Sequence, residues 1–181
     1  MLKLNKRPCQ IGNSMSTNTE KHGDDDVGAI DLKLDGMMLN AAELDSLLGD
    51  GAHAAIYHRQ KSNGKGSDEL AEIRFPHLKP LQFKDDFEKS RVELHVGIDN
   101  EQIVLADSKV RRVTLTPNAG GLTTMACSVR STPDSDTVAA LYDHLNSEGS
   151  VAIRSGKLVE KQADKQRDLS LGEGEEAAAP A

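Results

Sequence analysis

Apolar and polar residues alternate with a period of two in several stretches, and this alternation constrains the fold more than any other feature. Segment 92–98 alternates in this way, and Asp99-Asn100 turns the chain into the apolar run 103–105, which predicts a β-hairpin. Segments 113–115 and 125–129 alternate around the turn 117–121, which predicts a second hairpin. Shorter strand-like segments lie at 30–34, 70–75, 78–83 and 151–153. We therefore expect a mainly antiparallel sheet or sandwich.

Two segments have the spacing of amphipathic helices instead. Asn40 stands three residues before Glu43, which matches a capping box, and the leucines that follow keep helical spacing up to Gly49. The run 133–136 consists of residues that are common at the N-terminus of a helix, and apolar residues follow it with the periodicity of one helix face. Residues 52–58 also fit a short helical piece. The expected class is a β-dominant α+β domain with two short helices.

Both ends of the chain lack this periodicity. Residues 1–26 are polar and include three consecutive aspartates, so we expect a solvated, flexible N-terminal arm. Met15 offers an alternative start, and residues 1–14 are then expected to be dispensable. Residues 157–181 end in GEGEEAAAPA and are expected to form a disordered acidic tail. The compact domain is expected over residues 27–156.

Composition limits the class of protein further. No apolar run approaches the ~20 residues that span a bilayer, and no apolar run follows the basic N-terminus, so neither a membrane segment nor a secretory signal is expected. Cys9 and Cys127 stand far apart, and we expect no disulfide and a reducing, cytoplasmic location. The net charge of −7 disfavours nucleic-acid binding, which usually requires a positive surface.

No residue pattern predicts catalysis. His22 stands near the run 24–26, but we favour a solvated acidic linker over a metal site because no scaffold would hold these ligands. His53 and His58 are five residues apart and do not align on one helix face. Cys127 alternates with apolar neighbours and is expected to be a buried core residue. We expect no catalytic residue, no metal and no cofactor.

Five cations on neighbouring predicted strands are the candidate nucleic-acid-binding residues: Lys109, Arg111, Arg112, Arg130 and Arg154. If Arg112 and Arg130 lie on the outer face of one sheet, they form a basic strip able to contact phosphates. This strip predicts binding of single-stranded DNA, although such binders usually add aromatic platforms, which are scarce in this sequence. The alternative is a solvent-exposed face of mixed charge that includes Glu93 and Asp107.

Protein–protein binding is the remaining functional class. Edge strands beside Pro76 and Pro80 are compatible with strand addition by a partner or with a homo-oligomer. We therefore expect a non-enzymatic binding protein that acts through a protein partner. The alternative is a single-stranded DNA-binding or recombination accessory protein, and an enzyme of unrecognised class is the third hypothesis.

The motifs IDLKLDGMMLNAAELDSLLG and RRVTLTPNAGGLTTMACSVRSTPDSD resemble a set of small uncharacterised proteins of tailed bacteriophages and prophages. The resemblance covers roughly residues 30–153 in overall style. Its most specific part is a lysine- and arginine-bearing strand, a Pro-x-x-Gly-Gly turn, and a returning strand with a following helix. It implies no catalytic residue. It implies an accessory role in DNA metabolism, inhibition of host enzymes or defences, or a minor particle component, with the host cytoplasm as the location.

Overall fold

The computed structural model describes residues 2–22, 25–59, 71–77, 79–97, 99–155 and 158–159. In chain order the elements are β1 (Lys3–His22), β2 (Asp25–Leu39), α1 (Ala41–Leu48), α2 (Ala52–Ile56), β3 (Tyr57–Arg59), β4 (Ala71–Ile73), β5 (Leu81–Gln82), β6 (Asp86–Val96), β7 (Glu101–Pro117), β8 (Thr123–Ser131), α3 (Ser135–Asp143), β9 (Glu148–Arg154) and β10 (Leu158–Val159). The predicted β-dominant α+β class is confirmed, with three short helices among the described residues where two were expected.

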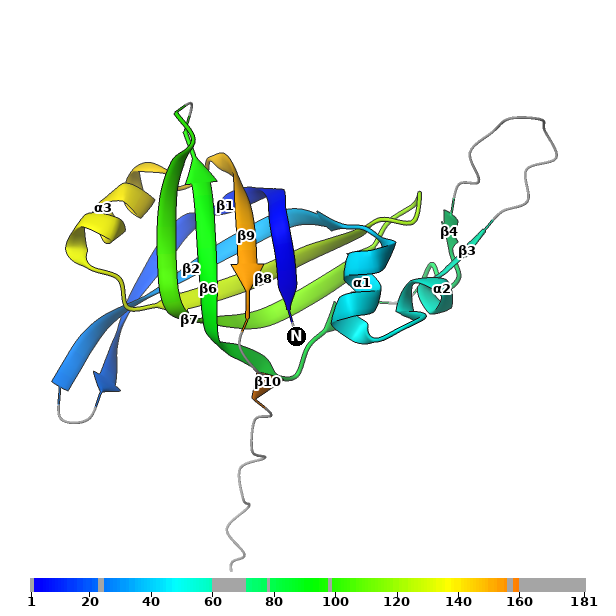
Figure 1. The fold of residues 1–181 in the computed structure, drawn as a ribbon, viewed down its shortest axis with the longest axis horizontal. Helices are drawn as coiled ribbons and strands as arrows, with labels where there is room; N and C mark the ends of the chain where they lie inside the picture. The colour runs from blue at the N-terminus through cyan, green and yellow to red at the C-terminus, as the bar shows by residue number, and fades with distance from the viewer. Residues whose placement is uncertain are drawn as a thin grey trace, which may run out of the picture.

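Six strands close into one antiparallel sheet (Figure 1). Each strand pairs with the next in the order β1-β2-β8-β7-β6-β9, and β9 pairs back with β1. We call this six-stranded ring the closed sheet. The short strand β5 pairs with β7, β10 pairs with β6, and β3 and β4 form a separate two-stranded sheet. Of the two predicted architectures, the structure therefore has a single sheet that closes on itself rather than a sandwich.

Aliphatic side chains from alternate positions fill the interior of the closed sheet. Leu34 on β2, Leu94 on β6 and Val151 on β9 have no exposed surface. Both predicted hairpins are present, with Glu93 opposite Val104 between β6 and β7, and β7 paired with β8 beyond the turn. Because a shift of one residue would turn every buried side chain outward, the alternating pattern also specifies the strand register.

The N-terminal segment belongs to the closed sheet, so the prediction of a flexible arm over residues 1–26 is wrong. β1 pairs with β2 along one edge and with β9 along the other. Register shifts in both pairings space the inward-facing residues of β1 unevenly, which hides the alternation in the sequence. Residues 1–14 are not dispensable, because this end contributes four buried side chains, those of Leu2, Leu4, Cys9 and Ile11. The predicted tail, 157–181, lies outside the described residues except for β10.

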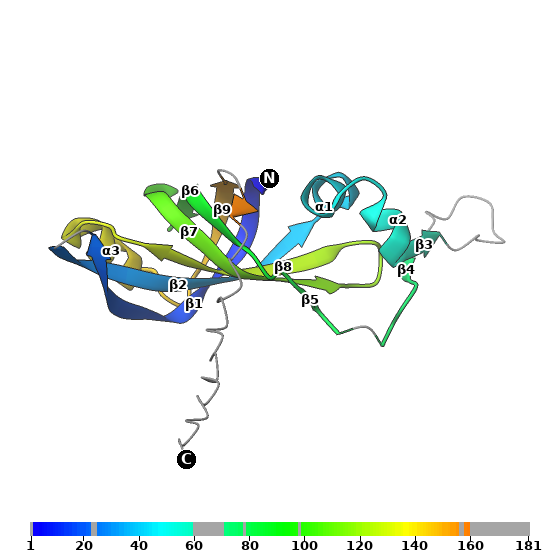
Figure 2. The ribbon, with the colours of Figure 1, turned by 90° about the horizontal axis from the view of Figure 1, so that it is seen from below.

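The helices lie at opposite ends of the closed sheet, with α3 at one end and α1 and α2 at the other (Figures 1 and 2). The predicted capping box is confirmed: the Asn40 side chain accepts from the Glu43 backbone, and the Glu43 side chain accepts from the Asn40 backbone, each at 3.0 Å. Arg7 of β1 donates to the same Glu43 carboxylate at 2.8 Å, which ties α1 to the closed sheet. At the other end, the predicted helix start is present at Asp134, and Leu141 of α3 is buried.

None of the helices in these described ranges is long and apolar enough to cross a membrane.

Candidate functional site

Three bulges in β6 and β7 reshape the outer face of the closed sheet. The strand register shifts beside Lys89, Asp107 and Arg112, whose φ angles are 50°, 48° and 51°. At each bulge two consecutive residues lie outside the core, where a regular strand would bury one of them. A left-handed backbone at a non-glycine residue costs about 1–3 kcal/mol, and such residues often cluster at functional sites. The three bulges therefore make this face of the closed sheet a candidate functional surface.

The outward residues line three adjoining hollows of about 350, 400 and 320 Å³. Arg130 lines the first and the third of these hollows, and Arg112 lines the second and the third, so the hollows form one shallow groove, which we call the outer groove. Its cationic lining residues are Lys84, Lys89, Lys109, Arg111, Arg112 and Arg130. Its anionic lining residues are Asp31, Asp86, Glu88 and Asp107.

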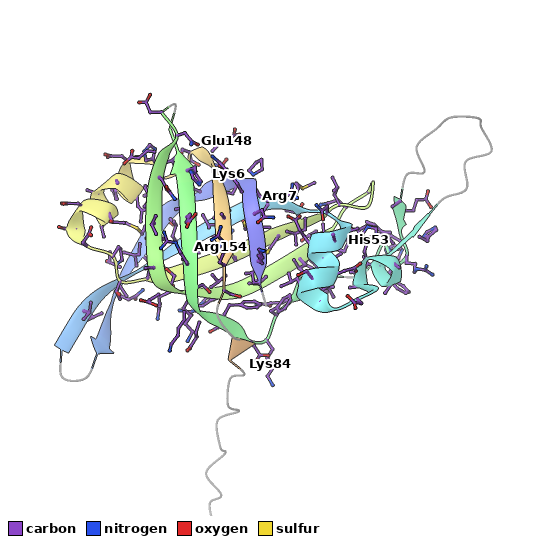
Figure 3. The ribbon with its side chains drawn as sticks, in the orientation of Figure 1. Lys6, Arg7, His53, Lys84, Glu148 and Arg154 are labelled. Carbon is purple, nitrogen blue, oxygen red and sulfur yellow. The ribbon has the colours of Figure 1, made fainter. Side chains whose placement is uncertain are left out.

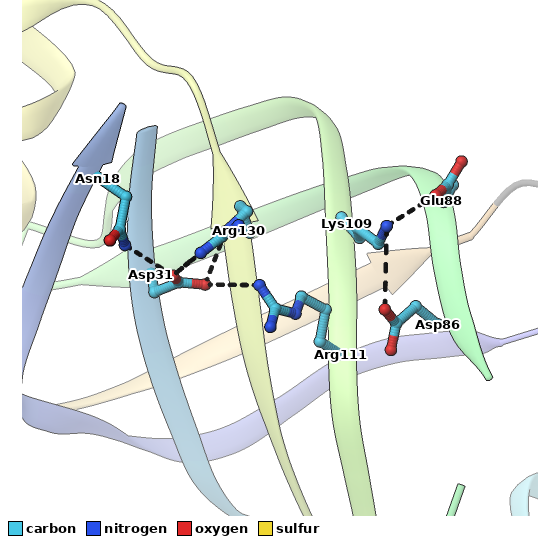
Figure 4. Close-up of polar contacts among 7 residues, drawn as sticks. All are labelled: Asn18, Asp31, Asp86, Glu88, Lys109, Arg111 and Arg130. Carbon is cyan, nitrogen blue, oxygen red and sulfur yellow. Dashed lines mark hydrogen bonds and ion pairs between the residues drawn. The ribbon is translucent and has the colours of Figure 1, made fainter. Parts of the chain in front are cut away.

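Asp31 on β2 holds two of these arginines in place (Figure 4). Arg130 Nε donates to Asp31 Oδ1 at 3.1 Å, and Arg111 Nη1 lies 3.5 Å from the same oxygen. Asn18 on β1 donates a further hydrogen bond to Asp31 Oδ2 at 3.0 Å. Partial burial by itself raises the pKa of Asp31, but the hydrogen bond and charge of Arg130 and the charges of the other arginines lower it below its usual range. Asp31 is therefore ionised at neutral pH and orients both guanidinium groups.

The remaining cations of the outer groove differ in how far they are neutralised. Lys109 Nζ lies 2.8 Å from Glu88 Oε1 and 3.9 Å from Asp86 Oδ2, so its charge is balanced within the groove (Figure 4). Arg112 is exposed and forms no ion pair within the part of the chain that the structure describes. Arg112 is therefore the predicted strip residue in the groove with the greatest freedom to bind an external anion.

The structure brings four of the five predicted strip residues together and separates the fifth. Lys109, Arg111, Arg112 and Arg130 all line the outer groove. Arg154 lies on β9 between β1 and β6, outside the groove (Figure 3). The groove combines features of both hypotheses: its cations outnumber its carboxylates, yet most of the strip residues already have carboxylate partners.

Sequence reasoning missed Asp31 and the bulges. Asp31 is one of the two polar residues that alternate with apolar residues within 30–34, and nothing local distinguishes it as a site residue. It contacts Arg130 because β2 pairs with β8, which places residues 31 and 130 directly opposite each other. The bulges do leave a signal, because the alternation breaks twice between residues 103 and 115. Such breaks in a predicted strand indicate a reshaped outer face.

The other sequence candidates take structural roles. His53 Nε2 contacts the carbonyl oxygen of Gly121 at 3.0 Å, and His58 Nε2 lies 3.4 Å from Glu72 Oε2, so the two histidines contact different partners. Among the described residues, no group of three or more His, Cys, Asp or Glu side chains could hold a metal ion. The side chains of His22 and of residues 24–26 lie outside the described part.

Both cysteines are free and buried. Burial raises the pKa of the Cys9 thiol to about 11 and that of the Cys127 thiol to about 12. The prediction that Cys127 is a core residue is confirmed, whereas Cys9 lies in the core and not in the flexible arm predicted for residues 1–26.

No protein-family model matches the sequence, and neither a curated protein nor a solved structure matches the chain.

Proposed function

We propose that this chain is a non-enzymatic binding protein whose outer groove contacts an acidic segment of a protein partner. The observation that carries this proposal is the pair of arginines oriented by Asp31, with exposed Arg112 beside them. Guanidinium groups bind carboxylates through paired hydrogen bonds, and groups already oriented lose less conformational freedom when a partner binds. The resemblance to phage accessory proteins is compatible with this role.

The aromatic content of the groove favours a protein partner over single-stranded nucleic acid. Phe83 is the one aromatic residue among the described groove residues, and it is half-buried against Phe87. Non-specific single-strand binders gain about 1–3 kcal/mol for each base that stacks on an aromatic side chain. The described groove provides little surface for such stacking.

Charge reversal in the groove tests the proposal. The full-length wild type, an Arg111→Glu/Arg112→Glu variant and a matched Lys6→Glu/Lys79→Glu control are used as bait in nuclease-treated lysate. Both control lysines are exposed and lie outside the outer groove, and the net charge changes equally. We expect the wild type and the control to capture a protein that the groove variant does not capture. When purified, that protein should bind the wild type directly. Identical capture by all three baits would refute a role for the groove.

Single-stranded DNA binding through the outer groove is the second candidate. One observation favours it: the groove has six cationic and four anionic residues, although the whole chain has a net charge of −7. It predicts oligonucleotide binding that weakens steeply with salt and is lost in the groove variant. Homo-oligomerisation also remains a prediction, and light scattering that gives the mass of a single chain would contradict it.

A further inference from the structure

A second cationic cluster lies on β1, β9 and β6 of the closed sheet, outside the outer groove. Lys3 on β1 stands directly opposite Arg154 on β9, and Arg154 stands directly opposite Arg91 on β6. We call these three residues the cationic row. Neighbouring strands are about 4.8 Å apart, so the three backbone positions lie within about 10 Å. Figure 3 labels Arg154, the central member.

The interior of the sheet determines which way the row points. The next residues along the three strands, Leu4, Ile153 and Val92, form the adjoining row and are at most 1% exposed. Because consecutive strand residues face opposite sides, the three cations must lie on the outer surface, and all three are exposed. Their positions therefore follow from core packing and well-defined register.

In the described part of the chain, one carboxylate ion pair offsets only part of the charge of the row. Like charges directly opposite each other on neighbouring strands are destabilising. Arg91 Nε donates to Glu93 Oε1 at 2.7 Å, and this hydrogen bond and the nearby arginines lower the pKa of Glu93. Within the part of the chain that the structure describes, neither Lys3 nor Arg154 forms an ion pair. The row thus has three cations and one neighbouring carboxylate in a chain of net charge −7.

We propose that Lys3, Arg154 and Arg91 bind successive phosphate groups of a phosphate chain, either the backbone of single-stranded nucleic acid or an inorganic polyphosphate. One strand of duplex DNA carries one phosphate for about every 3.4 Å of the helix axis, which is of the same order as the spacing of about 4.8 Å between neighbouring members of the row. Arginine donors match phosphate geometry bidentately. The row lies on an exposed strand face, and its members line none of the three hollows of the outer groove, which favours an extended chain over a small enclosed ligand.

A further cation lies beside the row, along β6 and not in the direction of the row itself. On β6, Lys89 stands two residues from Arg91 and is also exposed, and it lines the outer groove. A phosphate chain that crosses β1, β9 and β6 and then turns along β6 would therefore meet this further cation at the edge of the groove. The proposal does not depend on a protein partner in the groove, since the row alone supplies three contacts.

Fluorescence anisotropy with a labelled oligothymidylate of about 20 nucleotides tests the cationic row. The full-length wild type is compared with the triple variant Lys3→Gln/Arg91→Gln/Arg154→Gln and with the control Lys6→Gln/Lys33→Gln/Lys79→Gln. The control removes the same charge from three exposed lysines elsewhere. Circular dichroism establishes that all three proteins are folded.

We expect the row variant to bind about tenfold more weakly at about 50 mM salt, and the control to stay within about threefold of the wild type. Loss of three phosphate contacts should also reduce the slope of log K against log salt by about 2, because each contact on a single strand contributes about 0.7. Displacement of the oligonucleotide by tripolyphosphate would show that any phosphate chain suffices. Oligonucleotide binding that tripolyphosphate does not displace would show that the row binds the phosphates of a nucleic-acid backbone and not those of an inorganic polyphosphate.

Two results would overturn the proposal: no binding by the wild type of the oligonucleotide or, in a direct calorimetric titration, of tripolyphosphate, or equal affinities of the row variant and its control. Binding lost in an Arg111→Gln/Arg112→Gln variant but kept in the row variant would instead support DNA binding through the outer groove. Suppose that all three baits capture the same proteins in the pull-down, and that the row variant loses oligonucleotide binding. These two results would refute the proposed protein partner of the outer groove and support the phosphate site of the cationic row.

Discussion

Replacing Ile11 with alanine tests whether β1 is a structural part of the closed sheet. The Ile11 side chain has no exposed surface, and its residue pairs with Leu34 of β2. Its backbone N–H also donates to the carbonyl oxygen of Ser147 at 2.9 Å, close to the start of β9. Ile11 therefore lies where β1 connects β2 to β9. The first residue of β9, Glu148, is 137 positions further along the chain than Ile11.

The expected magnitude follows from the atoms removed. Isoleucine to alanine deletes three carbon atoms, and at about 0.8 kcal/mol each the lost transfer free energy is about 2.4 kcal/mol. A residual cavity adds to this loss, which puts the decrease in the free energy of unfolding at about 3–4 kcal/mol. For a chain of this size, such a decrease lowers the melting temperature by roughly 6–16 °C.

Urea unfolding followed by far-UV circular dichroism measures this change, since the chain has no tryptophan for fluorescence. Thr17→Ala is the matched control, because Thr17 is an exposed residue of the same strand, and its replacement should change stability by less than about 1 kcal/mol. If the N-terminal segment were a solvated arm, Ile11→Ala would change stability by less than about 0.5 kcal/mol. That result would refute the role assigned to β1.

Three further predictions concern other parts of the molecule. Asn40→Ala removes the side-chain cap of α1 and should lower the free energy of unfolding by about 1 kcal/mol, measured by urea unfolding, whereas Asn40→Asp should change it little. Cys9 and Cys127 should react with Ellman's reagent at about pH 8 only after unfolding, because burial raises both thiol pKa values, and rapid reaction of the native protein would contradict this. Asp31→Asn should be less stable than the wild type at neutral pH. Because the folded-state pKa of Asp31 is lowered, this difference should be present above the unfolded value of about 3.9 and disappear as pH falls through the folded value, which melting temperatures across pH would show.

Local patterns were sufficient wherever neighbouring residues make the structure. The hairpins β6–β7 and β7–β8, and the capping box of α1, arise from contacts between residues close in the chain, and all three were predicted. β1 was missed because its partners are distant and its bulges disturb the period of two. A single-sequence pattern carries no information about which distant strand completes a sheet.

The candidate sites follow the same division. The sequence named Lys109, Arg111, Arg112, Arg130 and Arg154 as cations of one strip, but pairing of β9 with β1 and β6 places Arg154 in a different cluster. Lys3 and Asp31 were not recognised, since each gains its significance from a residue on another strand.

By itself, the sequence determined the strands of the two hairpins, the starts of α1 and α3 and the aliphatic character of the core, because these depend on local period and side-chain chemistry. The tertiary structure alone decided that the sheet closes through β1, that Asp31 orients two arginines, and that three cations align across β1, β9 and β6. The physical reason is that closure and cross-strand register bring together residues that are 63 to 151 positions apart, and no local free-energy preference encodes such a contact.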